Sequence, residues 1–166
     1  MPSFLNDEQA QLTQEIAEAL TTRSEKIAVS DGTTGGLISA ALLSVPGAST
    51  YYAGGGVLYT LKSRIELAGM PAAAYENYRG TTPEMLAGLA EAMRKRLDTT
   101  WGIAESGLAG PTGGHSGAGP GRTTVAIAGP VARVETLETG SDDRMENMVA
   151  FTTFALRVLR DTLTGR

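Results

Sequence analysis

The sequence predicts an α/β protein, built as a three-layer α/β/α sandwich around a mixed, mainly parallel sheet with a late antiparallel hairpin. Short apolar strands alternate with helical segments in the early part of the chain, as they do in parallel sheets. The later strand-like runs "RTTVAIAG" and "VARVETLET" meet at Gly129-Pro130, which indicates a hairpin. The 166 residues are enough for one domain with its own core, so we expect a single domain over residues 1–166.

Four elements are predicted in the N-terminal part. A helix follows Asn6, a natural N-cap, and carries its apolar residues on one face. Residues 26–30 form a buried strand, and residues 36–45 form a helix that is apolar nearly all round and therefore buried. The run "YYAGGGVLYT" is a second strand, in which Gly54 to Gly56 mark a bulge or a close backbone approach.

The remaining elements are equally regular. We expect a short helix over residues 61–68 that ends at Gly69, and a longer one that starts at Thr82-Pro83. The strand "TTWGIAE" leads into a glycine-rich loop over residues 106–121. The last helix is predicted to be capped by Ser141. The buried faces of these two longer helices are predicted from residues spaced three and four apart: Leu86, Leu89, Met93 and Leu97, then Met145, Met148, Thr152, Leu156, Leu159 and Leu163.

Composition excludes several classes of function. The net charge of −4 and the pI near 5.0 argue against nucleic-acid binding, which needs a basic face. Cysteine is absent and His115 is the single histidine, so we expect no thiol nucleophile, no metal site and no cofactor. No basic-then-apolar leader and no apolar stretch of about 20 residues is present, so we expect a cytoplasmic protein without membrane contact.

The loop "VSDGTTGG", at the end of the first strand, is the first candidate site. Gly35 and Gly36 open a helix, whose free N–H groups would attract an anion. Thr33 and Thr34 add hydroxyls, and Asp31 adds a carboxylate. The loop could hold a nucleophile, cradle a ligand or be a capped turn, but it is not a P-loop, because the lysine is missing.

A second group of candidates comes from the later loop and from the helix start after the glycine bulge. Ser106 and Thr112 follow a strand, and loops at the carboxyl ends of parallel strands converge on ligands. The alternative is a mobile surface loop, in which His115 is an ordinary loop residue. Glu105 is either a general base or a paired carboxylate. Tyr59, Lys62 and Arg64 offer a phenol and cations, or simply a solvated helix start.

The stretches "DGTTGGLISAALLSVPGASTYYAGGGVLYT" and "WGIAESGLAGPTGG" resemble the C-terminal domain family of the competence/damage-inducible protein CinA. The resemblance runs from about residue 10 to residue 163. It implies a three-layer α/β/α domain and an amidohydrolase that converts nicotinamide mononucleotide to nicotinic acid mononucleotide and ammonia. It also implies a homo-oligomer. Larger family members carry a further nucleotide-hydrolysing domain, for which these 166 residues leave no room.

The departures from the family pattern bear on activity. The family block Ala-Glu-Ser-Cys-Thr-Gly-Gly aligns with residues 30–36, so that its nucleophilic serine falls on Gly32. The family tyrosine matches Tyr59, and the family lysine falls on Arg64, which cannot be deprotonated at ordinary pH. Lys62 lies nearby and is a possible substitute.

Two main functional hypotheses follow. If the loop keeps a nucleophile, Thr33 or Thr34 takes that role, activated by Lys62, Glu105 or Asp31. If it does not, the chain is a catalytically silent homologue that binds a nucleotide; a hydrolase for a different amide is a third class. The catalytic candidates are Thr33, Thr34, Tyr59, Lys62, Arg64 and Glu105. The substrate-binding candidates are Ser30, Asp31, Gly32, Gly35, Gly36, Gly55, Ser106, Gly107, Gly110, Pro111, Thr112, Gly113 and Gly114, and the expected ligand is a small-molecule nucleotide.

Overall fold

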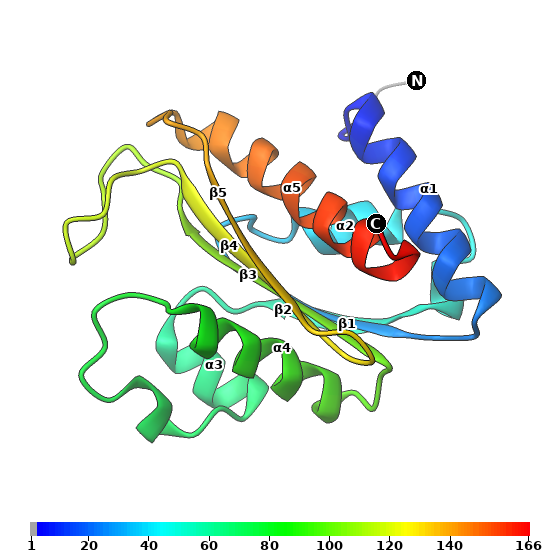
Figure 1. Cartoon of the computed structure of the whole chain (residues 1–166), viewed down its shortest axis with the longest axis horizontal. Coiled ribbons are helices and arrows are strands. Elements are labelled where there is room, and N and C mark those ends of the chain that lie inside the picture. The colour runs from blue at the N-terminus through cyan, green and yellow to red at the C-terminus, as the bar shows by residue number, and fades with distance from the viewer. Residues whose placement is uncertain (1–2) are drawn as a thin grey trace.

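The computed structural model describes residues 3–166, which form three layers. Figure 1 shows α1, α2 and α5 on one face of a central sheet and α3 and α4 on the other. The elements in chain order are α1 (Asp7–Thr22), β1 (Ile27–Asp31), α2 (Leu37–Leu43), η1 (Ala48–Thr50), β2 (Tyr52–Val57), α3 (Leu61–Ala68), η2 (Ala72–Tyr75), α4 (Pro83–Arg96), β3 (Trp101–Leu108), β4 (Arg122–Ala128), β5 (Arg133–Glu138) and α5 (Arg144–Thr164). Across the described residues, none of the helices combines the length and apolar character needed to cross a bilayer.

The sheet is mixed, with the strand order β2-β1-β3-β4-β5. β1 pairs in parallel with both β2 and β3, whereas β4 is antiparallel to both β3 and β5. Four strands therefore run in one direction and β4 alone runs in the other. The predicted α/β/α sandwich with a late hairpin is confirmed.

Two apolar cores hold the layers together. Val29 and Ile103 lie in the core beneath α1, α2 and α5, and Ala28 and Ala104 lie in the core beneath α3 and α4. The face of the sheet under α3 and α4 is lined by small residues such as Ala28 and Ala104, so α4 approaches the strand backbone closely. A Cβ at Gly102 would collide with the carbonyl oxygen of Ala90. The same close packing brings the residues around α3 and α4 near the end of β3.

The predicted helix starts are confirmed where a capping residue announced them. Asn6 and Gln9 form a capping box at α1. Thr60 and Ser63 form another at α3, a cap that was not predicted from the sequence. Thr82 accepts the backbone N–H of Met85 at 3.1 Å, with Pro83 in the first turn of α4. In these cases a side chain satisfies an N–H that the helix itself leaves free.

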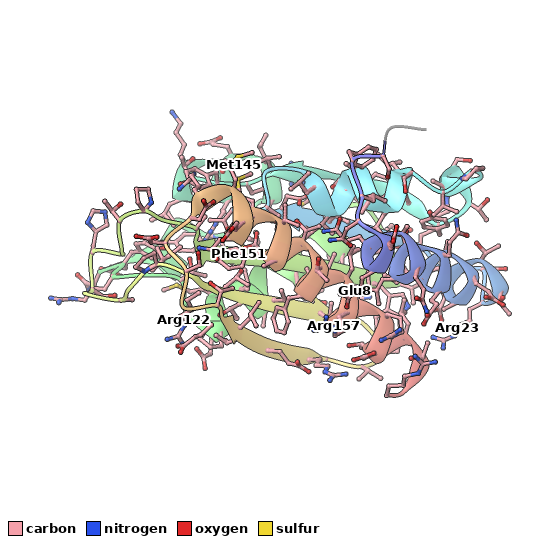
Figure 2. The ribbon with its side chains drawn as sticks, turned by 90° about the horizontal axis from the view of Figure 1, so that it is seen from above. Glu8, Arg23, Arg122, Met145, Phe151 and Arg157 are labelled. Atoms are coloured by element: carbon pink, nitrogen blue, oxygen red, sulfur yellow. The ribbon has the colours of Figure 1, made fainter. Side chains whose placement is uncertain are left out.

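Three predictions about α2 and α5 are wrong in detail. Helix α2 is shorter than expected and is not buried all round, because Leu43 at its end is 52% exposed. Helix α5 is capped by Asp143, whose carboxylate accepts the N–H of Glu146 at 2.9 Å. Ser141 instead accepts the N–H of Asp143. Met145 is 75% exposed and lies outside the core, as Figure 2 shows at the start of α5.

The boundary of the glycine-rich loop is also different. Ser106, Gly107 and Leu108 are not loop residues, because they pair with Thr124, Thr123 and Arg122 of β4. The loop therefore covers residues 109–121.

On the face of the sheet opposite α3 and α4, helices α1 and α5 lie side by side, and Glu8 contacts Arg157 between them (Figure 2).

Candidate active site

The side chain of Glu105, on β3, lies at the centre of the hydrogen bonds that hold the loop of residues 31–36. Its carboxylate is 1% exposed and lies within hydrogen-bonding distance of five donors, one of which, the Thr34 hydroxyl, it shares with Asp31. Two of these donors are the backbone N–H groups of Gly32 (3.2 Å) and Thr34 (3.0 Å), and three are hydroxyls, including that of Thr123 at 2.6 Å. Since five donors surround its two oxygens, this carboxylate is fully occupied in the structure. Glu105 anchors the 31–36 loop to β3.

The carboxylate of Asp31 binds the N–H groups at the start of α2, just as that of Glu105 binds those of the loop. It is fully buried, and its oxygens accept the N–H groups of Ile38 (3.0 Å) and Ser39 (3.2 Å) and the hydroxyl of Ser39 (2.7 Å). These are N–H groups of the helix start at which we expected an external anion. The chain's own carboxylate holds them instead. Gly35 and Gly36, with φ of 64° and 99°, make the turn that allows this.

The two threonines of the loop are directed at these carboxylates. Thr34 is fully buried, and its hydroxyl lies 2.7 Å from Asp31 and 3.0 Å from Glu105. Thr33 is 7% exposed, and its hydroxyl donates to Glu105. A hydroxyl carries one proton, so Thr34 can serve only one carboxylate at a time. Both side chains lie inside the protein, where their hydrogen bonds fix the loop against β3.

Several predicted substrate-binding glycines are required by backbone packing. A Cβ at Gly32 would collide with the carbonyl oxygen of Glu105. The same is true at other positions, each against a different backbone carbonyl. These positions are Gly55 (carbonyl of Val29), Gly107 (Arg122), Gly110 (Asp142) and Gly113 (Ala118). Their lack of a side chain is thus explained without a ligand.

Arg64, which the resemblance aligned with the family lysine, is 3% exposed. Its guanidinium donates to the carbonyl of Leu58 (3.3 Å), to Thr81 Oγ1 (2.9 Å) and to Ser106 Oγ (3.0 Å). None of the ion pairs among residues 3–166 includes Arg64. A permanent charge is therefore buried against neutral oxygen atoms.

Tyr59 and Lys62 lie apart from this buried network. Tyr59 is 57% exposed, and its hydroxyl accepts a long hydrogen bond of 3.5 Å from Arg144. Arg144 also donates to the carbonyl of Gly110 at 2.7 Å, so Tyr59 stands beside the start of the 109–121 loop. Lys62 is exposed. The structure brings neither residue into hydrogen-bonding contact with Thr33 or Thr34.

A cavity of about 350 Å³ opens beside the Arg64 network. Of the predicted residues, Ser106, Gly107 and Gly114 line it, together with His115. The other lining residues are Tyr78, Arg79, Gly80, Thr81, Pro83, Leu108, Ser116, Ala118, Arg122 and Thr124. The turn before α4, the end of β3, the tip of the glycine loop and the start of β4 thus meet around one hollow. Arg122 stands at this end of the molecule in Figure 2.

A larger groove of about 700 Å³ lies elsewhere, between α5 and β5. Its lining is mostly apolar and includes Leu137, Met145 and Val149. No group of three or more potential metal ligands occurs within residues 3–166. Of these two hollows, the smaller cavity is the one that contains predicted site residues.

Sequence reasoning missed several residues of this region. Thr81 stands next to the helix cap Thr82 and gave no separate signal, although it binds Arg64. Thr123 was expected only as part of a strand, yet it donates to Glu105. Asn147 is 1% exposed and donates to the carbonyls of Ala109 and Ser141, both at 2.9 Å. The sequence offered one hint of the role of Asn147: it is a polar residue on the buried face of α5.

Comparison with known proteins agrees with this architecture. The family model of the CinA C-terminal domain matches residues 9–163. The chain belongs to this family. A CinA-like protein from Parasynechococcus marenigrum (strain WH8102) is 38% identical over 127 residues, which are 76% of this chain and 30% of that protein. Another, from Desulfosudis oleivorans, is 31% identical over 163 residues, or 97% of this chain and 39% of that protein.

Solved structures of the CinA superfamily share the fold. A superfamily protein from Klebsiella pneumoniae 700603 superposes with a TM-score of 0.87 at 21% identity, covering 95% of this chain and 99% of that one. The competence/damage inducible protein from Agrobacterium tumefaciens gives 0.85 at 24% identity, covering 95% and 97%. The chain spans between a third and two-fifths of the length of relatives such as those from Desulforapulum autotrophicum and Desulfosudis oleivorans.

Proposed function

We propose that this CinA-family domain binds a nucleotide of the nicotinamide mononucleotide type without hydrolysing it through the family serine. The observation that carries the proposal is the position of Gly32, where a side chain would collide with the backbone of Glu105. The pocket around Ser106 remains, but the nucleophile that the family uses has neither an atom nor room in this backbone. Loss of a nucleophile alone removes many orders of magnitude of rate.

The cavity suits such a ligand in size and polarity. Its volume of about 350 Å³ lies within the range of small-molecule sites, and hydroxyls from Tyr78, Thr81 and Ser106 line it. Arg79 and Arg122 add positive charge. The lining thus offers a phosphate-bearing nucleotide hydroxyls and cations for its phosphate, and the apolar side chain of Leu108 for its base.

A second candidate is carboxamide hydrolysis with a displaced nucleophile. The contact of the Thr33 hydroxyl with Glu105 has the form of a nucleophile and its base. Thr33 Oγ would attack the carboxamide carbon while Glu105 takes its proton. Glu105 would pass that proton to the nitrogen, which leaves as ammonia, and water would then hydrolyse the ester to free Thr33 and the carboxylic acid. The burial of both groups and the four other bonds on Glu105 weigh against this route.

One experiment separates the two candidates. Nicotinamide mononucleotide is titrated into the purified protein by calorimetry, and ammonia release is followed in parallel with the Thr33→Val variant and the exposed control Thr50→Val. Binding without ammonia is the expected result. Ammonia that disappears only in Thr33→Val would favour the hydrolase instead. If the nucleotide does not bind at all, the proposed function is wrong.

The resemblance also leads us to propose a homo-oligomer. Light scattering coupled to size exclusion measures the mass in solution directly. A mass equal to the 17.3 kDa chain across the accessible concentration range would contradict the proposal.

A further inference from the structure

The buried charge of Arg64 is not balanced by any ion pair within the described chain. At 3% exposure it has lost most of its water, and a buried charge is costly unless it is paired. A guanidinium has five N–H donors, and only one each on Nε, Nη1 and Nη2 is used here. The acceptors are the neutral oxygens of Leu58, Thr81 and Ser106. The site therefore carries spare positive charge and spare donors.

The guanidinium also orients the hydroxyls in front of it. Because arginine only donates, the oxygens of Ser106 and Thr81 must accept its hydrogen bonds, and their own protons point onward. Thr81 shares a 2.9 Å bond with the hydroxyl of Tyr78, and Ser106 reaches Thr81 only at 3.3 Å. All three hydroxyls line the cavity. Tyr78, Thr81 and Ser106 thus place three hydroxyl groups, backed by a permanent cation, in the wall of the cavity.

The charge of the cavity lining contrasts with that of the whole chain. The protein carries a net charge of −4, yet Arg79 and Arg122 line the cavity and none of its described lining residues is acidic. Glu138 lies 3.4 Å from Arg122, but both side chains are more than half exposed, so water screens that pair. The charged residues that line the cavity are therefore basic, and such a lining attracts anions.

A further polar group of this cluster has no partner. Tyr75 is 7% exposed, and among residues 3–166 its hydroxyl makes no hydrogen bond. Its ring packs edge-on against Tyr78, with centroids 6.2 Å apart. Burial raises the pKa of Tyr75, and the charge of Arg64, together with a polar contact too loose to count as a hydrogen bond, partly opposes this. The hydroxyl thus lies close to the same unbalanced guanidinium.

We propose that this cavity is an oxyanion site, in which the hydroxyls of Ser106, Thr81 and Tyr78 bind a carboxylate or phosphate whose charge balances Arg64. The inference rests on the proposed function only in naming which end of the nucleotide enters first. It assigns Arg64 as a positioning residue that selects an anionic group over a neutral amide. An arginine is suited to this role because its charge is permanent and its donors form a rigid fork.

The test uses three small probes on the intact protein: inorganic phosphate, nicotinate and its neutral isostere nicotinamide. Affinities are measured by NMR titration for the native protein, Arg64→Met and Ser106→Ala. The control is Arg94→Met, which removes a partly buried arginine that pairs with Glu91 and does not line the cavity. The conservative variant Arg64→Lys keeps the charge without the fork.

We expect at least one anion to bind about tenfold more tightly than nicotinamide, as a charge-assisted hydrogen bond would provide. Arg64→Met and Ser106→Ala should each weaken that binding about tenfold, Arg64→Lys should weaken it less than Arg64→Met, and Arg94→Met should leave it unchanged. Ser106→Ala keeps the test valid if Arg64→Met does not fold. The anion whose affinity responds identifies the group as phosphate or carboxylate.

The opposite results are equally clear. Equal affinity for nicotinate, phosphate and nicotinamide, or anion binding that is unaffected by Ser106→Ala and Arg64→Met, overturns the inference. If the nucleotide binds with the same affinity to the native protein, Arg64→Met and Ser106→Ala, the proposed function stands and the oxyanion site fails. If the anions bind through Ser106 and Arg64 while the nucleotide does not bind, the oxyanion site stands and the proposed function fails.

Discussion

The backbone of Glu105 passes so close to Gly32 that no side chain fits between them. A Cβ atom at Gly32 would collide with the carbonyl oxygen of Glu105 and lie 3.3 Å from the Cα of Ser106. At the same time, the N–H of Gly32 donates to the Glu105 carboxylate at 3.2 Å. The glycine is thus built into the packing of the loop on β3. If the family serine aligns with Gly32, as the resemblance implies, its side chain has no room in this backbone.

Restoring the serine is therefore expected to destabilise the protein and not to activate it. We predict that Gly32→Ser lowers the free energy of unfolding by about 1–3 kcal/mol, because the strand backbone must move to admit the side chain. It should release no ammonia from nicotinamide mononucleotide. Urea denaturation measures the first effect and a coupled ammonia assay the second.

Gly119→Ser is the matched control for this change. No atom lies within 4 Å of a Cβ at Gly119, so its stability should match that of the native protein. Ammonia release by Gly32→Ser, with native stability, would show that the backbone adjusts freely and that the fold still accepts the family's chemistry.

The buried carboxylate of Glu105 should be the most sensitive polar group of the loop. Glu105→Gln keeps the shape but places an NH₂ group among five donors, so that at least two of them lose their acceptor. We predict a loss of about 2–3 kcal/mol in the free energy of unfolding. The control Glu138→Gln, whose side chain is 71% exposed, should change it by less than about 0.5 kcal/mol. Equal effects in the two variants would contradict the role assigned to Glu105.

The parts of the fold that local rules control were predictable from the sequence. Thr82 and Pro83 announced α4, and Gly69 announced the end of α3, because a cap or a left-handed turn depends only on neighbouring residues. The end of β3 was misplaced, because "SGL" resembles a loop in isolation. Its pairing with β4 depends on partners about 15 residues away, which no local pattern reports.

The site was predictable in its residues but not in their partners. Glu105 and Arg64 were both identified, one as a base or a paired carboxylate and the other as a cation. Their burial and their opposite surroundings, donors around one and neutral oxygens around the other, come from packing between distant strands and helices. Thr81 and Thr123 have no distinctive sequence context, so only the tertiary structure brings them to the site.

Thr34 joins the two buried carboxylates, so removing its hydroxyl should weaken the loop. Thr34→Val keeps the shape and deletes the one side-chain hydroxyl that hydrogen-bonds to both Asp31 and Glu105 among residues 3–166. We predict a loss of about 1–3 kcal/mol in the free energy of unfolding. Thr50→Val, at an exposed position, serves as the control. Unchanged stability in Thr34→Val would mean that the carboxylates do not depend on this hydroxyl.

Asn147 should set the order of the glycine loop. Its amide donates to the carbonyls of Ala109 and Ser141, both at 2.9 Å, and thereby ties the start of the loop to α5. Asn147→Leu leaves those carbonyls without a donor, so we expect a loss of about 1–3 kcal/mol and faster hydrogen exchange in residues 109–121. The control is Met145→Leu, at an exposed position two residues earlier in α5. It should change neither the free energy of unfolding nor the exchange rate of the loop. Slow exchange retained in the loop of Asn147→Leu would assign its order to other contacts.

The positive lining of the cavity predicts how ligand affinity depends on salt. Arg122 and Arg79 are exposed, so their attraction for a phosphate acts through water and is screened when the Debye length shortens. Binding of nicotinamide mononucleotide should therefore weaken between about 50 mM and about 500 mM NaCl. Arg122→Gln should weaken it about two- to fivefold at the lower salt concentration and hardly at the higher one, since an exposed charge contributes about 0.2–1 kcal/mol. Arg133→Gln on β5, outside the cavity lining, is the control, and calorimetry at both salt concentrations is the measurement. Equal losses for Arg122→Gln at both concentrations would instead indicate a direct, dehydrated contact, because only a charge that acts through solvent disappears under screening.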